Sequence, residues 1–230
     1  SRLSGGLVHD FNNMLTPILT YCDLIMANDD PEQKNEYAAQ IKKAAVTAKN
    51  LVSQLQAFSR KQSVTPVIFD INNIIEQMKP MLKTTIGEDI KLDFNLSDSV
   101  CSIKAGKIQI EQVLMNMLIN ASHAVKRFGH IKISTSRVNV KNSADIEGYA
   151  LMPLKTGNYI VIEIRDNGHG INKKDFRKIF EPYHSTKKEK GSGLGLFMVH
   201  NIISSLHGGI SIQSVPGKKT IFRLYIPAVK

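Results

Sequence analysis

The run VHDFNN at residues 8–13 places a histidine, a carboxylate and an amide within a short stretch of chain. Apolar residues recur on both sides of it in steps of three and four, which predicts a helix over residues 3–27. Residues four apart share a helix face, so His9 and Asn13 point the same way. Asp10 stands beside His9, which lies off the apolar stripe. The run therefore offers a nucleophile, a base and a water-positioning group on an exposed helix face.

A second amphipathic helix is expected over residues 32–61, after a turn signal at residues 28–31. Its apolar positions come close to a heptad pattern over several turns. Two such helices joined by a short turn form an antiparallel hairpin. One hairpin cannot bury two apolar stripes well, so we expect a homodimer through residues 1–62 that completes a four-helix bundle.

The helical pattern breaks at residues 62–66, QSVTP, which predicts a hinge linker at residues 63–67. Beyond it, residues 68–230 mix helix and strand patterns, which predicts an α+β domain with one sheet and helices on one face. Residues 139–158 are polar and irregular and are expected to form a loop. Helices are expected at residues 71–86, 107–128 and 192–207, and strands at 91–95, 130–139, 159–165, 210–214 and 220–226.

The chain has 230 residues and a formal net charge of +10. This charge indicates either a solvated basic surface or an anionic partner such as nucleotide phosphates or an acidic protein. Nucleic acid is disfavoured because no groove-reading motif or aromatic-basic stripe is present. No apolar run reaches about 18 residues, so no membrane contact is expected. Cys22 and Cys101 lack metal-ligand spacing and indicate reduced thiols in a cytoplasmic protein.

The helix expected over residues 107–128 carries an apolar stripe and a parallel polar stripe. Asn116 and Asn120 lie one turn apart on the polar one. A polar stripe is often only a solvated face. Amide oxygens on this stripe can also serve as neutral ligands to a magnesium ion that is bound mainly by phosphates.

A carboxylate ends the strand expected over residues 159–165 and precedes a glycine turn, in the run DNGHG at residues 166–170. One interpretation is a simple hairpin-type Asn-Gly turn. The other is that Asp166 accepts a hydrogen bond from an adenine amine, while Gly168 and Gly170 let the backbone approach the base closely.

A glycine-rich run, GSGLGL at residues 191–196, opens the last expected helix. Backbone N–H groups at such a helix start favour phosphate. The run is neither a Walker loop nor a convincing dinucleotide fingerprint, because no Gly-Lys-Ser/Thr follows and no strand directly precedes it. The residues of interest in this region are Lys187, Gly191, Gly193, Leu194 and Gly195.

The order of these motifs resembles that of a two-component sensor histidine kinase, over nearly the whole chain. The likeness is to a dimerisation and histidine-phosphotransfer domain followed by an ATP-binding domain of the GHKL type. His-Asp-Phe-Asn-Asn resembles a subgroup often found in hybrid kinases. The resemblance implies ATP and Mg²⁺ as cofactors, with Asn120 of the N box as a metal ligand. His123 and Gly106 depart from the pattern, because acidic residues are common at their places.

The resemblance further implies that Asp166 belongs to the first glycine box, and residues 191–196 to the second. Residues 180–187 resemble the family's F box, and the charges that begin at Lys187 suit a triphosphate. ATP would phosphorylate His9, which Asp10 orients or deprotonates, and His9 would pass the phosphoryl group to an Asp of a response-regulator receiver domain.

Asn13 either supports regulator dephosphorylation, as the family pattern implies, or merely solvates the helix.

Two rival functions stay open at this point. One is a regulatory nucleotide-binding module without kinase activity. The other is hydrolysis of ATP to water, as in chaperone, mismatch-repair and topoisomerase ATPases. Acid-labile label on the protein would separate a kinase from both.

Overall fold

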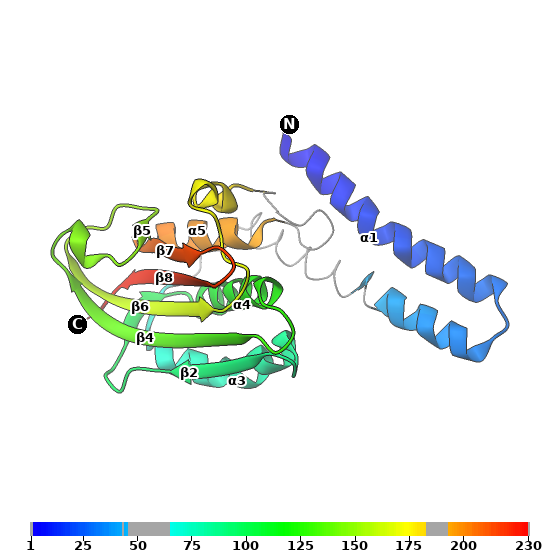
Figure 1. Cartoon of the computed structure of the whole chain (residues 1–230), viewed down its shortest axis with the longest axis horizontal. Coiled ribbons are helices and arrows are strands. Elements are labelled where there is room, and N and C mark those ends of the chain that lie inside the picture. Colours follow the sequence, from blue (N-terminus) through cyan, green and yellow to red (C-terminus); the bar gives the residue numbers. More distant parts are fainter. Residues whose placement is uncertain (1, 43, 46–64, 183–192, 230) are drawn as a thin grey trace. The chain divides into compact units, whose positions relative to one another are not determined.

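The computed structural model describes residues 2–42, 44–45, 65–182 and 193–229 (Figure 1). They fall into two units, an N-terminal helical unit and a C-terminal α+β unit.

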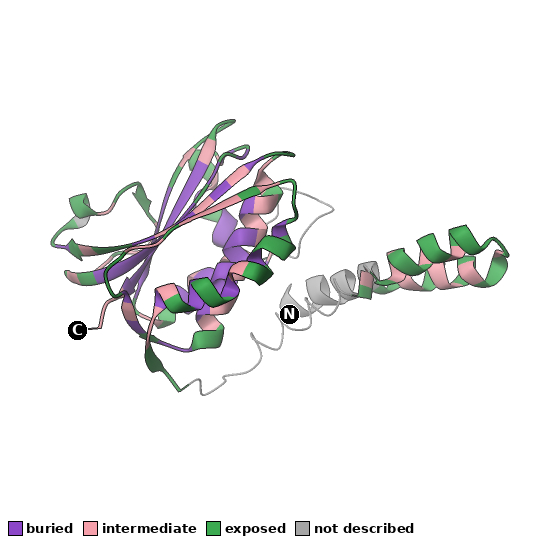
Figure 2. Ribbon diagram, turned by 90° about the horizontal axis from the view of Figure 1, so that it is seen from below, coloured by how far each residue is buried: buried purple, intermediate pink, exposed green. Residues whose placement is uncertain are grey.

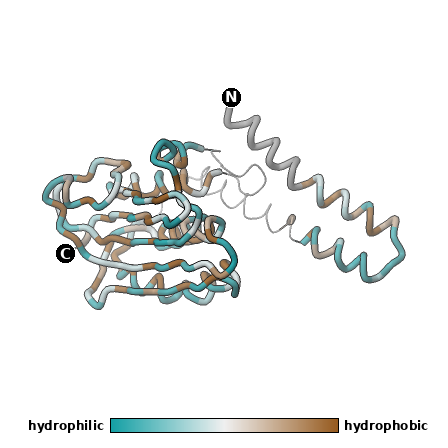
Figure 3. Tube along the Cα trace, viewed as in Figure 1, coloured by the Kyte–Doolittle hydropathy of each residue, from teal (hydrophilic) through white to brown (hydrophobic). Residues whose placement is uncertain are grey.

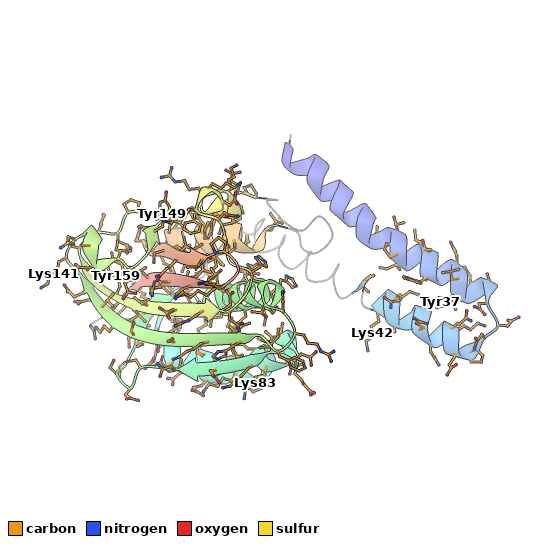
Figure 4. The ribbon with its side chains drawn as sticks, viewed as in Figure 1. Tyr37, Lys42, Lys83, Lys141, Tyr149 and Tyr159 are labelled. Atoms are coloured by element: carbon orange, nitrogen blue, oxygen red, sulfur yellow. The ribbon has the colours of Figure 1, made fainter. Side chains whose placement is uncertain are left out.

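The N-terminal unit is a helical hairpin. Helix α1, Arg2–Ala27, contains Pro17, and residues 31–42 and 44–45 are helical as well. Asp30 starts the second helix, because its carboxylate accepts a hydrogen bond from the backbone N–H of Glu32 at 2.9 Å. The rings of Tyr21 and Tyr37 stack between the two helices with centroids 5.8 Å apart (Figure 4). The predicted hairpin is therefore confirmed for its described part; the rest of the second helix, to residue 61, lies outside the described residues.

The C-terminal unit contains a six-stranded sheet with helices on one face (Figure 1). Strand β2 is parallel to β4, and the other neighbouring strands are antiparallel. The order across the sheet is β2 (Lys91–Asn95), β4 (His130–Val140), β6 (Gly157–Asp166), β8 (Lys219–Pro227), β7 (Gly209–Val215) and β5 (Tyr149–Ala150). The helices are α3 (Ile71–Ile86), α4 (Lys107–Ala124) and α5 (Gly195–Ser205). This arrangement confirms the predicted α+β fold.

The core lies between the sheet and the helices, where Figure 2 shows the buried residues concentrated. Strand residues two apart share a face, so Ile160 and Ile162 of β6 both point to the helices and are fully buried. Ile110 and Leu114 of α4 meet them from the other side, in the same hydrophobic cluster. Burial of each such side chain stabilises the fold by roughly 1.5–3 kcal/mol.

The opposite face of the sheet is partly covered by the segment that joins β4 to β6. Tyr159 of β6 (Figure 4) and Tyr225 of β8 meet edge to face there, with Ile146 and Leu154 of the connecting segment packed on the same cluster. Arg223 of β8 pairs with Glu147 of that segment at 2.7 Å and with Glu163 of β6 at 2.8 Å.

Several elements differ from those expected. The segment 139–158 is not wholly a loop, because it holds a short helical turn, η1 (Ser143–Asp145), and strand β5. A second sheet pairs β1 (Val67–Asp70) with β3 (Ser102–Ala105), so Val67, expected to end the linker, begins a strand. Helix α4 ends at Ala124, because Val125 is extended and Phe128 has a φ of 61°. Helix α5 runs over Gly195–Ser205 and not over residues 192–207.

A buried hydroxyl joins α3 to the sheet. Thr135 donates to the side-chain oxygen of Asn72 at 2.8 Å and accepts from the backbone N–H of Ser97 at 2.9 Å. Asn72 in turn donates to the Ser97 carbonyl at 2.9 Å. The Asn72 side-chain oxygen and the Ser97 N–H both depend on this hydroxyl for their hydrogen bonds.

Replacing Thr135 with Val should lower the free energy of unfolding by about 1–3 kcal/mol, because two partly buried polar groups lose their hydrogen-bond partner. Urea unfolding of the whole chain measures this. Thr135→Ser is the matched control, since it keeps the hydroxyl and removes only a methyl group. Equal losses in the two variants would show that the hydroxyl network adds nothing.

Candidate functional site

Two amides on α4 lack hydrogen-bond partners. Asn116 is 6% exposed, and Asn120 lies one turn further along the same helix face. The side-chain nitrogen atoms of both are buried and unpaired. An unpaired buried donor costs about 1–3 kcal/mol, and such groups in native proteins call for an explanation such as a ligand. The described part of the chain contains one other buried side-chain atom of this kind, on Arg223.

The start of α5 lies against this amide pair. A Cβ atom placed on Gly195, the first residue of α5, would lie 3.4 Å from Asn120 Nδ2 and 3.7 Å from Asn116 Oδ1. Helix α5 has no side-chain cap and no acidic residue in its first turn. Its preceding residue Leu194 is 8% exposed, and Gly193 has a φ of 65°. The start of a helix, with its partial positive charge, thus lies directly against two amide groups.

A buried carboxylate ends β6. Asp166 is 3% exposed, and its Oδ1 accepts a hydrogen bond from the backbone N–H of Gly168 at 2.8 Å. Burial raises the pKa of the Asp166 carboxyl above its ordinary value, against the opposing effect of the Gly168 N–H. A buried carboxylate that keeps acceptor capacity can select a ligand that donates a hydrogen bond.

The turn after Asp166 is fixed to the end of α4. The backbone N–H of His169 donates to the Ala124 carbonyl at 3.0 Å. A Cβ on Gly168 would lie 2.5 Å from that same carbonyl oxygen, so this approach requires glycine. Gly170 has a φ of 69°, and a Cβ there would lie 2.3 Å from the Val215 carbonyl oxygen.

Helix α4 therefore brings the predicted residues of the site together. It carries both amides in its middle, and Ala124, one turn beyond Asn120, holds the turn that orients Asp166. A rise of about 1.5 Å per residue separates the amides from that turn by roughly 6 to 12 Å along the helix. This length suits an extended ligand with a hydrogen-bond donor at one end and acceptors at the other.

Other predicted site residues, or their side chains, lie outside the described part of the structure. Lys187 and Gly191 lie outside the described residues. His9, Asp10 and Asn13 lie within α1, but their side chains are outside the described part of the structure.

Two residues beside Asp166 were not among the predicted site residues. Thr220 of β8 is its partner in the register and is 2% exposed, and Asn167 pairs with His130. The Asp-Asn-Gly run could have pointed to Asn167, but no local pattern marks Thr220.

Family models match both units of the chain. Residues 105–230 match the histidine kinase-, DNA gyrase B- and HSP90-like ATPase, and residues 1–64 match the His Kinase A (phospho-acceptor) domain. The chain belongs to the sensor histidine kinase family.

Similar sensor kinases are known from bacteria. Sensor kinase CckA of Brucella abortus is 36% identical over 230 residues, which are 98% of this chain and 24% of that protein. Signal transduction histidine-protein kinase AtoS of Escherichia coli is 30% identical over 98% of this chain and 34% of its own length. The chain thus spans about a quarter to a third of these two relatives' length.

Solved histidine kinases share the fold. Histidine kinase ThkA, in a complex with response regulator protein TrrA, superposes on all of this chain with a TM-score of 0.74 at 20% identity, over 62% of its own length. Histidine kinase AdeS of Acinetobacter baumannii has a TM-score of 0.66 at 21% identity, over 96% of this chain and 98% of its own.

Asp166→Asn should raise the free energy of unfolding at pH 7, because it removes a buried charge and keeps an oxygen to accept the Gly168 N–H. The raised pKa means that the folded chain binds this proton more tightly than the unfolded chain does. Ionisation of Asp166 therefore disfavours folding as the pH rises above about 3.9. Thermal unfolding of both proteins from pH 4 to pH 8 should show the variant's advantage growing with pH. A variant that is less stable throughout this range would contradict it.

Proposed function

We propose that this chain is an ATP-dependent, autophosphorylating protein histidine kinase of a two-component system. The observation that carries the proposal is that the start of α5 lies against the side chains of Asn116 and Asn120, whose buried nitrogen atoms have no hydrogen-bond partner. Asp166 stands beyond the end of the same helix. The family match supports this nucleotide site, and the His Kinase A match over residues 1–64 supports a phosphoacceptor in α1.

Asp166 would read the base. Its carboxylate can accept a hydrogen bond from the exocyclic amine of adenine, while guanine presents a carbonyl oxygen at the equivalent place. Two acceptors facing each other leave both unsatisfied, which costs on the order of 1–3 kcal/mol. Gly168 and Gly170 keep this turn in place, because a Cβ on either would collide with a backbone carbonyl oxygen, of Ala124 and Val215 respectively.

The amides and the glycine run would hold the triphosphate. The N–H groups of Asn116 and Asn120 can donate to phosphate oxygens, as can backbone N–H groups of Gly191, Gly193, Leu194 and Gly195. Lys187 would neutralise part of the phosphate charge. The described residues contain no group of three His, Cys, Asp or Glu side chains that could hold a metal. Mg²⁺ would therefore be held by the phosphates and the Asn120 oxygen, and would offset charge on the transferring group.

His9 would be the nucleophile. One ring nitrogen forms a bond to the γ-phosphorus as the bond from that phosphorus to the bridging oxygen breaks, so ADP leaves. Asp10 would hold or take the proton on the other ring nitrogen, which keeps the attacking lone pair free. An oxygen of a receiver-domain aspartate would then bond to that phosphorus as the phosphorus–nitrogen bond breaks, which restores His9 and leaves an aspartyl phosphate.

Residues 1–62 would form a homodimer. Leu19 and Met26 of α1 are 64% and 77% exposed, and Figure 3 shows hydrophobic positions recurring along the hairpin. A second copy would bury this apolar surface in a four-helix bundle. We also propose residues 63–67, which end on the first residue of β1, as the linker to the ATP-binding domain, 68–230. ATP as substrate would place the chain in the cytoplasm. Among the described helices, none is both long and apolar enough to cross a bilayer.

His9→Gln should abolish acid-labile, base-stable label from radioactive ATP, because the nucleophile is lost, and should leave ATP affinity unchanged. His207→Gln, a histidine of the other unit, is the control and should label normally. Persistent label in His9→Gln would assign the phosphoacceptor elsewhere. Release of free phosphate without any label on the unmodified chain would favour an ATP-hydrolysing enzyme.

Asn13→Ala should leave autophosphorylation within about twofold of the unmodified chain and slow dephosphorylation of a phosphorylated receiver domain about tenfold or more. An amide one turn from His9 can both donate to and accept from a water molecule that attacks an aspartyl phosphate. The decay rate of a labelled receiver with each protein measures this. Equal decay rates would leave Asn13 as a surface residue.

A further inference from the structure

The last hydrogen-bonded residue pair between β4 and β6, here called the last rung of their ladder, uses a side-chain atom. The register of these strands ends at the pair Ile131 and Asp166, and the next residues are His130 and Asn167. The backbone N–H of Asn167 donates to the His130 carbonyl at 3.2 Å. In a regular antiparallel pair of this kind, the two residues exchange both backbone hydrogen bonds. Here the His130 N–H instead donates to Asn167 Oδ1, at 2.7 Å.

The side-chain oxygen of Asn167 thus takes the place of its own backbone carbonyl. That carbonyl is released from the ladder, and the chain leaves the sheet directly after Asp166. The next two N–H groups turn back: Gly168 donates to Asp166 Oδ1 and His169 donates to the Ala124 carbonyl. If the backbone carbonyl of Asn167 had to accept the hydrogen bond from the His130 N–H, the peptide group between Asn167 and Gly168 would have to rotate. The Gly168 N–H belongs to that peptide group and would rotate with it.

We propose that Asn167 is a positioning residue for nucleotide recognition: by completing the last β4–β6 rung with its side chain, it holds the Gly168 N–H on Asp166 and so aims that carboxylate at the base. The inference rests on the proposed role of Asp166 in adenine recognition. Asn167 acts through the turn and need not touch the nucleotide. Its loss should therefore affect the choice between bases more than the affinity for the triphosphate.

The same two strands supply a matched control. At the opposite end of the β4–β6 ladder, Asn139 donates across the strands to Asn158 Oδ1 at 2.8 Å, and both side chains are exposed. Asn158→Ala removes one exposed side-chain hydrogen bond between β4 and β6, as Asn167→Ala does, but does so away from Asp166. Asn167→Asp keeps an oxygen at the same place and should retain the rung.

The test is the ratio of the dissociation constants for GTP and ATP, measured on the whole chain by displacement of a fluorescent ATP analogue. Asn167→Ala should lower the ratio about two- to tenfold, as expected for one misaligned hydrogen bond. Asn167→Asp and Asn158→Ala should leave it unchanged. In an Asp166→Asn background, Asn167→Ala should have no further effect, because it acts through Asp166. Hydrogen exchange of the Gly168 amide should become faster in Asn167→Ala and not in Asn158→Ala.

The outcomes separate the two proposals. If Asp166→Asn lowers the ratio and Asn167→Ala does not, Asn167 has no positioning role while the role of Asp166 stands. The positioning role of Asn167 would also be overturned if Asn167→Ala and Asn158→Ala lost affinity for ATP and for GTP equally. That result would show that both variants merely loosen the strands. If Asp166→Asn leaves the ratio unchanged, Asp166 does not read the base, and the inference about Asn167 falls with it.

Discussion

The carbonyl of Ala124 at the end of α4 needs a donor, because the last carbonyls of a helix have no partner within it. The N–H of His169 supplies that donor from the turn after β6. This one hydrogen bond joins the helix that carries Asn116 and Asn120 to the strand that carries Asp166. Gly168 must be glycine because the Ala124 carbonyl passes so close to it. The distance between the two ends of the proposed nucleotide site depends on this junction.

The proposed site buries polar groups, whereas the core of the C-terminal unit is apolar, and the burial of these polar groups lowers stability. Asp166 is buried as a carboxylate with a raised pKa, and two amide donors are buried without partners. A fold selected for stability alone would fill these positions with apolar or paired groups. A bound nucleotide would offset the cost by supplying a donor to Asp166 and acceptors to the amides, so binding would stabilise the folded chain.

The sequence predicted the elements whose patterns are long and regular. The helices and main strands follow from periodicity, and the Asp-Asn-Gly-His-Gly and glycine-rich runs marked both ends of the proposed site. Strands β1 and β3 escaped prediction, because four residues are too few to show alternation and their pairing spans about 35 residues of chain. The end of α4 was missed because it depends on the backbone conformation of Val125 and Phe128. The contact of Ala124 with His169 involves backbone atoms alone, which leave no mark in residue type. Asn167 could have been noticed from its type, but its partner is a backbone N–H 37 residues away, which no local pattern indicates.

The central claim is that a nucleotide lies along α4, with its base at Asp166 and its phosphates at the amides. A crystal structure of the whole chain with Mg²⁺ and a non-hydrolysable ATP analogue tests this most directly. We expect the adenine amine within about 3.2 Å of an Asp166 carboxylate oxygen. We expect the metal about 2.0–2.1 Å from Asn120 Oδ1. A nucleotide bound away from α4, or in the reverse direction with its phosphates at Asp166, would contradict the claim.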